Sequence, residues 1–526
     1  MAEKQFVVVI GVPSIKKYVF GTDRLREIRG ASALLYNFNQ FKMVEFLKSS
    51  PELSSMETVF VGGGAGQFVI RATEANLRTC LKKLERVFAE ETSGGAHLIW
   101  GMADYGASNY QQAIKIADLE AFSKSQESPF HPFTLTHTGF IRECDSCSQM
   151  ASHLPLKYGD EEQILCDVCY SKVAYNYENA KMDLWQDLSQ YLKGKGIDVQ
   201  RPKSFEEIGE LCKARRGYTA LVYADGNSIG KILKAIEDEK SFKFLSEIID
   251  TSIREACHGA LYDACFVEAK EEPRVMPAEI LMLGGDDLLV YLTAETAFPF
   301  AIKMAEKFNE KTIEKLEGSS TKAFLREKLG GKGLYLSLGV AYGKSHTPFS
   351  ILLDQAEELL KSSKKAGSKD KMSKSHCSPT YIDYHLSSNF NQVSVENTRK
   401  NHLELSGKKL IRLYQKPYSL EDAKAILDAA KKLGMIGVTA TRLRRLGYAP
   451  SLGKMNGTLE FLKLYTRAPR EQREVIWDIL SRFGCAENIP WKVGQLEDST
   501  MLVDLLEIAA FSHKGEMSAE GGNDAA

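Results

Sequence analysis

The sequence predicts an α+β protein with two ferredoxin-like domains, an inserted zinc-binding module with four cysteines, and an all-α C-terminal bundle. Three observations support this prediction: a strand and turn pattern that occurs twice, two CxxC pairs between the copies, and helical periodicity after Ser419. The 526 residues suffice for several domains. We expect a first domain at 1–129, an insert at 130–172, a helical linker at 173–213, a second domain at 214–390, a helical domain at 391–514 and a disordered tail at 515–526.

The internal repeat consists of three blocks. In the first block, a strand ends at Gly11 or Asp225 and runs into a polar turn (VVIGVPSIKKYV and LVYADGNSIGKIL). In the second block, VFVGGGAGQFVI and LMLGGDDLLVYL each place a glycine turn between two apolar strands, which is typical of a β-hairpin. LIWGMADYG and LSLGVAYG form the third. The segments between blocks have helical periodicity, so each copy predicts a ferredoxin-like sheet with helices on one face.

Composition and charge exclude several classes of protein. Lys and Arg total 68 against 69 for Asp and Glu, so this is not a generally basic nucleic-acid coat, and any nucleic-acid contact is local or shared with partners. No apolar run approaches the ~20 residues of a membrane helix, and the run FVVVIGV near the N-terminus reads as a buried strand. Six of the ten cysteines are scattered singly. We therefore expect a cytoplasmic protein without a membrane partner.

Three carboxylates form the candidate catalytic and metal-binding set. Asp225 ends a strand, and Asp286 and Asp287 occupy the tip of the second hairpin. In a ferredoxin-like sheet the first strand and the central hairpin are neighbours, so these side chains should meet at one edge. Crowded carboxylates raise one another's pKa, and divalent cations relieve the repulsion; oxygen ligands favour Mg²⁺ or Mn²⁺. Two such ions can serve phosphoryl transfer. For GGDD alone, an Asp-rich turn without metal is the alternative.

The first repeat provides an internal comparison. Its aligned positions are Gly11, Gly64 and Ala65, so it keeps the glycine hairpin and lacks every carboxylate. We therefore expect one metal site, in the second repeat, facing a degenerate partner. Glycines allow the backbone to approach a triphosphate closely. The expected nucleotide contacts are Gly62, Gly63, Gly226, Asn227, Ser228, Gly284 and Gly285, with a helix N-cap as the alternative role of Ser228.

The cysteine pairs of the insert predict a metal centre of a different kind. Cys144 and Cys147 form one CxxC knuckle, Cys166 and Cys169 form the other, and 18 residues separate them. Four thiolates at this spacing close a tetrahedral Zn²⁺ site. Because no ligand position stays open, the zinc should be structural, and the first repeat should be its packing surface.

Together these motifs resemble the large polymerase/cyclase subunit of type III CRISPR effector complexes, whose two palm domains correspond to the repeats. The resemblance covers nearly the whole chain. It rests on YVFGTDRLREIRGASALL at 18–35, GGGAGQF at 62–68, the double CxxC insert, DGNSIGKIL at 225–233, LMLGGDD at 281–287, AEELLKSSKKAG at 356–367, PTYIDYHL at 379–386 and RLYQKPYSLEDAKAIL at 412–427.

The resemblance implies a nucleotidyltransferase that is activated by target RNA. Such a subunit joins ATP 3′ to 5′ into cyclic oligoadenylate second messengers and releases pyrophosphate. It works in an assembly with other protein subunits, a guide CRISPR RNA and the target RNA. Asp225, Asp286 and Asp287 carry over as the site of two Mg²⁺ or Mn²⁺ ions. Lys361 and Lys364 carry over as contacts to the ATP triphosphate, with a solvated helix end as the alternative.

The sequence departs from the family pattern in one respect. Most members begin with an HD nuclease domain, whereas this chain starts at the first palm and none of its ten histidines precedes an Asp. We therefore expect no DNase activity. Product ring size and the identity of the acceptor, ATP or another adenosine-bearing molecule, stay open. A stand-alone nucleotide cyclase and a catalytically silent scaffold subunit are the alternative functions.

Overall fold

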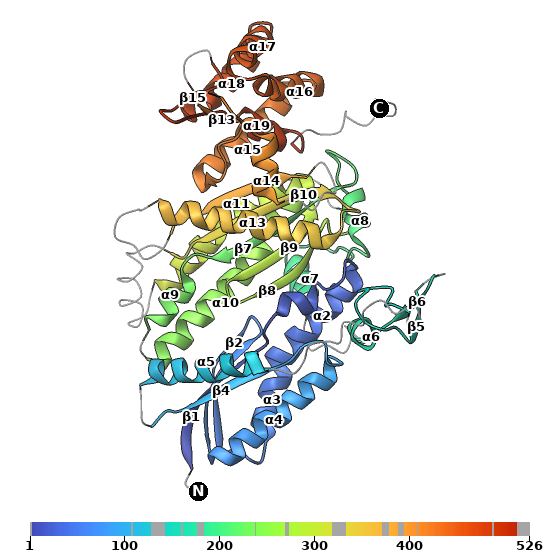
Figure 1. Ribbon diagram of the computed structural model, residues 1–526, viewed down its shortest axis with the longest axis vertical. Coiled ribbons are helices and arrows are strands. Elements are labelled where there is room, and N and C mark those ends of the chain that lie inside the picture. Colours follow the sequence, from blue (N-terminus) through green and yellow to red (C-terminus); the bar gives the residue numbers. More distant parts are fainter. Residues whose placement is uncertain are drawn as a thin grey trace.

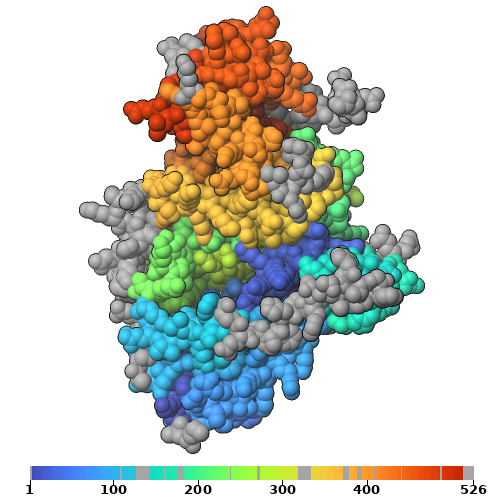
Figure 2. Space-filling model, in the orientation of Figure 1, coloured from blue at the N-terminus to red at the C-terminus, as the bar shows by residue number. Residues whose placement is uncertain are grey.

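Three domains follow one another along the long axis of the molecule, in chain order, with the cysteine insert beside the first (Figures 1 and 2). The computed structural model describes residues 3–106, 109–127, 142–158, 161–175, 183–236, 238–268, 273–317, 333–370, 378–387, 394–407, 409–485 and 489–512. The expected disordered tail at 515–526 lies outside these residues. Within them, no helix is both long and apolar enough to cross a membrane.

The first domain is a four-stranded antiparallel sheet in the order β2-β3-β1-β4, the ferredoxin-like order that the repeat predicts. Its strands are β1 (Lys4–Gly11), β2 (Ser55–Gly62), β3 (Ala65–Ala72) and β4 (Ile99–Asp104). Its helices are α1 (Ile15–Val19), α2 (Leu25–Asn37), η1 (Phe38–Lys42), α3 (Met43–Ser49), α4 (Glu74–Glu91) and α5 (Tyr110–Glu127).

The second domain repeats this order as β10-β7-β9-β8 and extends it by two strands, β11 and β14. Its strands are β7 (Tyr218–Gly226), β8 (Ala278–Gly284), β9 (Asp287–Thr293), β10 (Leu336–Lys344), β11 (Tyr381–Leu386) and β14 (Tyr418–Ser419). Its helices are α9 (Ile229–Lys234), α10 (Glu239–Tyr262), η3 (Asp263–Val267), α11 (Ala294–Leu316) and α13 (Phe349–Lys369). β11 pairs parallel with β10, and β14 joins this sheet from beyond residue 390.

Two backbone irregularities occur at matching places in both copies. The first hairpin has a β-bulge between Thr58 and Phe60, and the second has one between Ile280 and Met282. After the first strand of each copy, Ser14 and Ser228 adopt left-handed φ angles of 58° and 62°. Non-glycine residues rarely adopt this conformation, so its presence at two aligned positions supports the repeat at the level of the backbone.

The expectation that helices lie on one face of each sheet is wrong. α5 and α13, the last helix of each copy, cover the face opposite to the other helices. On β7, Val222 faces the α10 and α11 side, whereas Tyr223 faces α13. Both side chains are buried, which explains why this strand reads as a continuous apolar run rather than as an alternation.

The insert and the linker lie between the two repeats. The insert has a hairpin of β5 (Leu154–Tyr158) and β6 (Glu161–Leu165), and its helix α6 (Asp167–Ala174) packs against α2 of the first domain. The packing is close, because a Cβ on Gly30 of α2 would lie 1.7 Å from the Lys172 carbonyl oxygen. The linker contains α7 (Leu184–Gly194) and α8 (Phe205–Glu210).

The C-terminal region is helical, as predicted, and carries a small sheet that the sequence did not predict. Ser419 caps α15 by accepting a hydrogen bond from the Asp422 amide at 3.2 Å. The helices are α14 (Val395–His402), α15 (Leu420–Met435), α16 (Ala440–Tyr448), η4 (Ala449–Leu452), α17 (Lys454–Thr466), α18 (Arg470–Arg482) and α19 (Leu502–Ala509). The sheet has the order β12-β13-β16-β15 and consists of β12 (Glu404–Leu405), β13 (Leu410–Arg412), β16 (Glu497–Ser499) and β15 (Lys492–Val493).

Candidate active site

The predicted carboxylates lie at one end of the central strands of the second sheet, although they are not gathered as closely as the insert cysteines are. Asp225 on β7 is directly opposite Asp287 on β9, and the Gly226 amide donates to the Asp286 carbonyl oxygen at 3.2 Å. A Cβ on Gly226 would lie 2.8 Å from Asp286 Oδ2 and 2.3 Å from Ile229 Cδ1, so a larger residue would have to displace these side chains. The strand pairing therefore brings three acidic residues to one edge, as the sequence predicts.

The electrostatics of this edge are those of crowded, half-buried acids. Burial, with the Asp225 charge next in size and the Asp287 charge after it, raises the pKa of Asp286 to about 7. Burial and Asp225 raise the pKa of Asp287 to about 6. Excess negative charge of this kind suits hard divalent cations, so the donor set fits Mg²⁺ or Mn²⁺.

Two lysines from different domains counter this charge. Lys364 on α13 forms an ion pair with Asp225. Lys16 on α1 donates to Glu357 at 2.9 Å, lies 4.5 Å from the centroid of the Tyr223 ring, and acts to lower the pKa of Asp287. Lys16 is not predictable from the sequence, because only the face-to-face arrangement of the repeats brings the first domain to this end of the sheet.

The other expected nucleotide contacts differ in their surroundings. Lys361 is 76% exposed and 4.0 Å from Glu357, so it does not reach the carboxylates here. Asn227 is buried, and its amide donates to the Ser378 and Pro379 carbonyl oxygens at 3.1 and 3.0 Å. Both donors of that amide are therefore occupied in holding the loop. Ser228 stands at the N-cap position of α9 without a side-chain capping bond, so its hydroxyl is not used as a cap.

The glycine hairpins of the two repeats touch beside the carboxylates. A Cβ on Gly284 would lie 3.1 Å from the Gly63 nitrogen. A cavity of about 350 Å³ opens at this junction, which is within the range of small-molecule sites (roughly 300–1,000 Å³). The lining of the cavity is mainly apolar and includes a few polar side chains and one carboxylate. The lining residues include Val12, Ser14, Ile15, Lys16, Leu35, Tyr36, Asn39, Gln40, Gly63, Leu281, Leu283, Gly284 and Asp287.

The four insert cysteines converge as predicted. Their sulfur atoms all lie within 4.8 Å of one another, and Cys147 and Cys166 are 3.9 Å apart at sulfur. A tetrahedral zinc with Zn–S bonds of about 2.3 Å places its sulfurs roughly 3.8 Å apart, so the arrangement fits the ion. All four are free thiols. Within the described ranges, no other group of three or more such ligands is this compact.

The two cysteine knuckles pack on the first repeat, as expected from the sequence. Ser146, within the first knuckle, hydrogen-bonds Thr22 at 2.9 Å, and Arg24 donates to the Asp145 carbonyl oxygen at 3.0 Å. Lys172 of α6 donates to the Tyr18 carbonyl oxygen. The module thus braces the segment between α1 and α2, and α1 carries Lys16.

A comparison with known families decides the nature of the second repeat. Residues 218–373 match the family model of the Cas10/Cmr2 second palm domain. This palm domain spans β7 to the end of α13 and contains Asp225, Asp286, Asp287 and Lys364. For this part of the chain, the match bears out the resemblance that the motifs carry.

Solved structures extend the likeness in fold to nearly the whole chain. A chain of the Csm1-Csm4 cassette in complex with cA4 is 13% identical, with a TM-score of 0.56 over 97% of this chain and 70% of that chain. Csm1 in T. onnurineus is 14% identical, with a TM-score of 0.53 over the same shares. A chain of the Csm1-Csm4 subcomplex in the type III-A CRISPR-Csm interference complex is 13% identical, with a TM-score of 0.56 over 97% of this chain and 70% of that chain. Among curated proteins, none matches.

Proposed function

We propose that this chain is the target-RNA-activated nucleotidyltransferase subunit of a type III CRISPR antiviral complex, and that it joins ATP 3′ to 5′ into cyclic oligoadenylates. The observation that carries the proposal is the placement of Asp225, Asp286 and Asp287 at the same end of the second sheet, beside the cavity between the repeats. Structures of relatives with cA4, pppApApA and AMPPNP support it, because these ligands belong to such a reaction.

The three aspartates would hold two divalent ions, and these ions would activate the attacking 3′-hydroxyl and stabilise the leaving pyrophosphate. The residues of the chain itself bind and orient. Lys364 pairs with Asp225, Lys16 lies near enough to Asp287 to lower its pKa, and both lysines would neutralise phosphate oxygens of the nucleotide. The touching glycines at positions 63 and 284 leave the backbone open to close approach. The apolar cavity would take a base.

The chain would act within a larger assembly. The relatives were solved with Csm4 or within an interference complex, and we expect this chain likewise to bind other protein subunits. Guide CRISPR RNA and target RNA would bind to the assembly, since the chain has a formal net charge of only -1.

The test is product formation by the assembled complex with guide RNA, labelled ATP and Mg²⁺ or Mn²⁺. With matching target RNA, mass analysis should find cyclic oligoadenylates, and Asp286→Asn with Asp287→Asn should reduce their rate at least about 1,000-fold. Asp198→Asn is the matched control, since Asp198 is 85% exposed on the linker. Release of pyrophosphate with a different adenylated product would show that the acceptor is a molecule other than ATP. A complex that binds target but makes no product would instead support a scaffold.

A further inference from the structure

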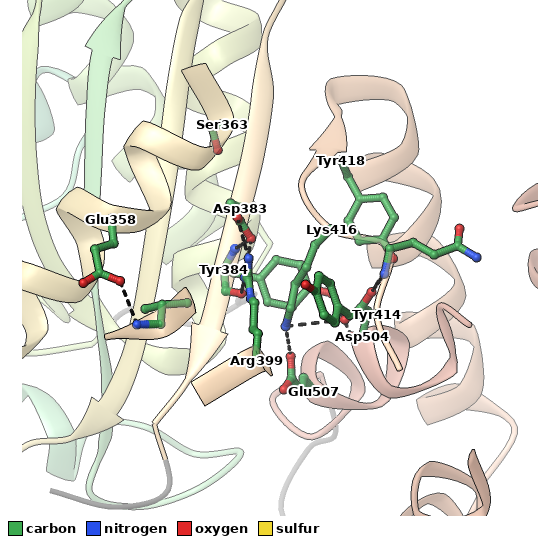
Figure 3. Close-up of polar contacts among 12 residues, drawn as sticks. Glu358, Ser363, Asp383, Tyr384, Arg399, Tyr414, Lys416, Tyr418, Asp504 and Glu507 are labelled. Carbon is green, nitrogen blue, oxygen red and sulfur yellow. Dashed lines mark hydrogen bonds and ion pairs between the residues drawn. The ribbon is translucent and has the colours of Figure 1, made fainter. Parts of the chain in front are cut away.

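A cluster of buried charges lies between the second palm and the C-terminal helices (Figure 3). We call it the junction cluster and define it as Asp383, Arg399, Lys416, Asp504 and Glu507. The side chains of Asp383, Lys416 and Asp504 are fully buried. Its members come from β11, α14, the segment before β14, and α19. Four separate elements therefore have to be in place for the cluster to form.

The contacts within the cluster are continuous. Arg399 donates to both carboxylate oxygens of Asp383, at 2.9 and 2.6 Å, and to the Tyr384 carbonyl oxygen at 3.0 Å. Lys416 lies 4.3 Å from the centroid of the Tyr384 ring and 3.4 Å from Asp504, and it pairs with Glu507. The Tyr384 hydroxyl donates to the Asp504 carbonyl oxygen at 2.8 Å. The chain of contacts thus runs from β11 to α19.

Burying a cluster of charges between two domains carries a large desolvation free energy. Each buried charge loses its hydration, and apolar side chains of similar size would stabilise the junction about as well. What charges add is directional contact, since the planar guanidinium of Arg399 accepts one orientation of the Asp383 carboxylate. The junction cluster therefore fixes the relative orientation of the elements that it joins, and one of the elements packed against it is part of the active site.

The neighbour is α13, the helix that carries Lys364. β11, which carries Asp383, packs directly against α13. Although burial acts to raise the pKa of Asp383, Arg399 outweighs that effect, with a smaller contribution from Ser362 of α13, and the pKa is lowered. Ser363 donates to the Leu338 carbonyl oxygen of β10 at 2.8 Å. The next residue, Lys364, forms the ion pair with Asp225. Nearly two turns before Lys364 on the same helix, Glu358 accepts a 2.7 Å hydrogen bond from the Val395 amide at the start of α14. Lys364 thus lies on a helix that packs against both β11 and α14, the two elements that Asp383 and Arg399 join.

We propose that Asp383 and Arg399 are positioning residues that set the placement of Lys364 against Asp225, so that the carboxylate site depends on how the C-terminal domain is seated. The inference rests on the proposed function and deepens it. The Asp383–Arg399 pair fixes α14 against β11. α13 packs on both of these elements and is tied to α14 through the Val395 amide and Glu358, and α13 presents Lys364 to the active site.

A double-mutant cycle in the assembled complex tests this. Arg399→Lys keeps the charge and loses the two-pronged contact. It should lower kcat for oligoadenylate synthesis about tenfold per folded complex, because small displacements of a site residue are costly. Lys364→Met should lower kcat at least as much. If Arg399 acts through Lys364, the double variant should be no slower than Lys364→Met alone. If the fold losses in kcat of Arg399→Lys and Lys364→Met multiply in the double variant, the two residues act independently and the proposal is overturned.

A matched control separates positioning from stability. Lys454→Met removes the partner of Asp498, which is 3% exposed, elsewhere in the C-terminal domain. At a temperature where both variants are folded, Lys454→Met should keep the wild-type kcat, and Arg399→Lys should speed hydrogen exchange of the α13 amides around 362–366. Equal kcat losses in both variants, with unchanged exchange in α13, would show a merely structural role. If the wild-type complex makes no product, the proposed function fails, and exchange in α13 alone decides the inference.

Discussion

At the scale of single residues, the account rests on how tightly the backbone approaches the carboxylates. Gly226 leaves room for Asp286 where a methyl group would not fit, and the Asp225 and Asp287 positions follow from strand register. The pKa values of Asp286 and Asp287 are raised because burial and mutual repulsion both disfavour the charged forms. The site is thus defined by a few atoms whose positions the β7–β9 pairing sets.

The first prediction concerns Gly226. In Gly226→Ala, the new Cβ displaces Asp286 or Ile229, so oligoadenylate synthesis by the complex should fall about 100-fold. Gly230→Ala is the control, because a Cβ at Gly230 on α9 would meet nothing within 4 Å. It should keep activity and slightly raise the melting temperature. Equal activity of both alanine variants would contradict the assigned geometry.

A second prediction concerns pH and His258. Burial lowers the pKa of His258 to about 4 from an ordinary 6.5, although Asp187 opposes this. The unfolded chain therefore binds a proton more readily between these values, and stability falls as pH drops from about 6.5 towards 4. Once the pH is below both pKa values, the loss in the free energy of unfolding from His258 is about 3 kcal/mol. His385, whose pKa burial lowers to about 3, adds a similar loss.

The measurement is urea unfolding of the full chain at pH 7 and pH 5. His258→Gln should lose less stability than wild type between these values, since one buried imidazole no longer has to be protonated on unfolding. If the two proteins lose equal stability on acidification, His258 does not titrate as its burial requires.

At the scale of elements, the repeat was predictable because both copies have the same order of apolar strands and glycine turns in the sequence. Ferredoxin-like order, both hairpins and the four-cysteine cluster could all be derived from spacing. The sequence could not show that α5 and α13 cover the second faces, since fully buried strands and buried helices have similar apolar runs. Strands of two or three residues, such as β15 and β16, are too short to show any period.

The element-scale prediction concerns the zinc module. Cys147→Ser should reduce bound zinc from one ion per chain to nearly none, as measured by elemental analysis, and should lower the melting temperature because the module packs on α2. Cys80→Ser, outside the cluster, should keep the zinc. Zinc retained in the Cys147 variant and lost in the Cys80 variant would refute the assignment.

At the scale of the whole molecule, the two palms form an unequal pair. The first contributes Gly63, Lys16 and most of the lining of the cavity, and the second contributes the carboxylates. The role of Lys16 could not be derived from the sequence, because no local pattern tells which turn of one repeat faces the other. The C-terminal domain then closes on the second palm through the junction cluster, whose members are spread over more than 120 residues between Asp383 and Glu507.

The most direct measurement is a titration of the chain with Mn²⁺ in the presence of a non-hydrolysable ATP analogue, followed by paramagnetic resonance. The account predicts two saturable ions in wild type and in Asp198→Asn, and loss of both at the same concentrations in Asp225→Asn with Asp287→Asn. If the doubly substituted chain binds the same number of ions with the same affinity, the carboxylates of the second palm are not the metal site, and the central claim is wrong.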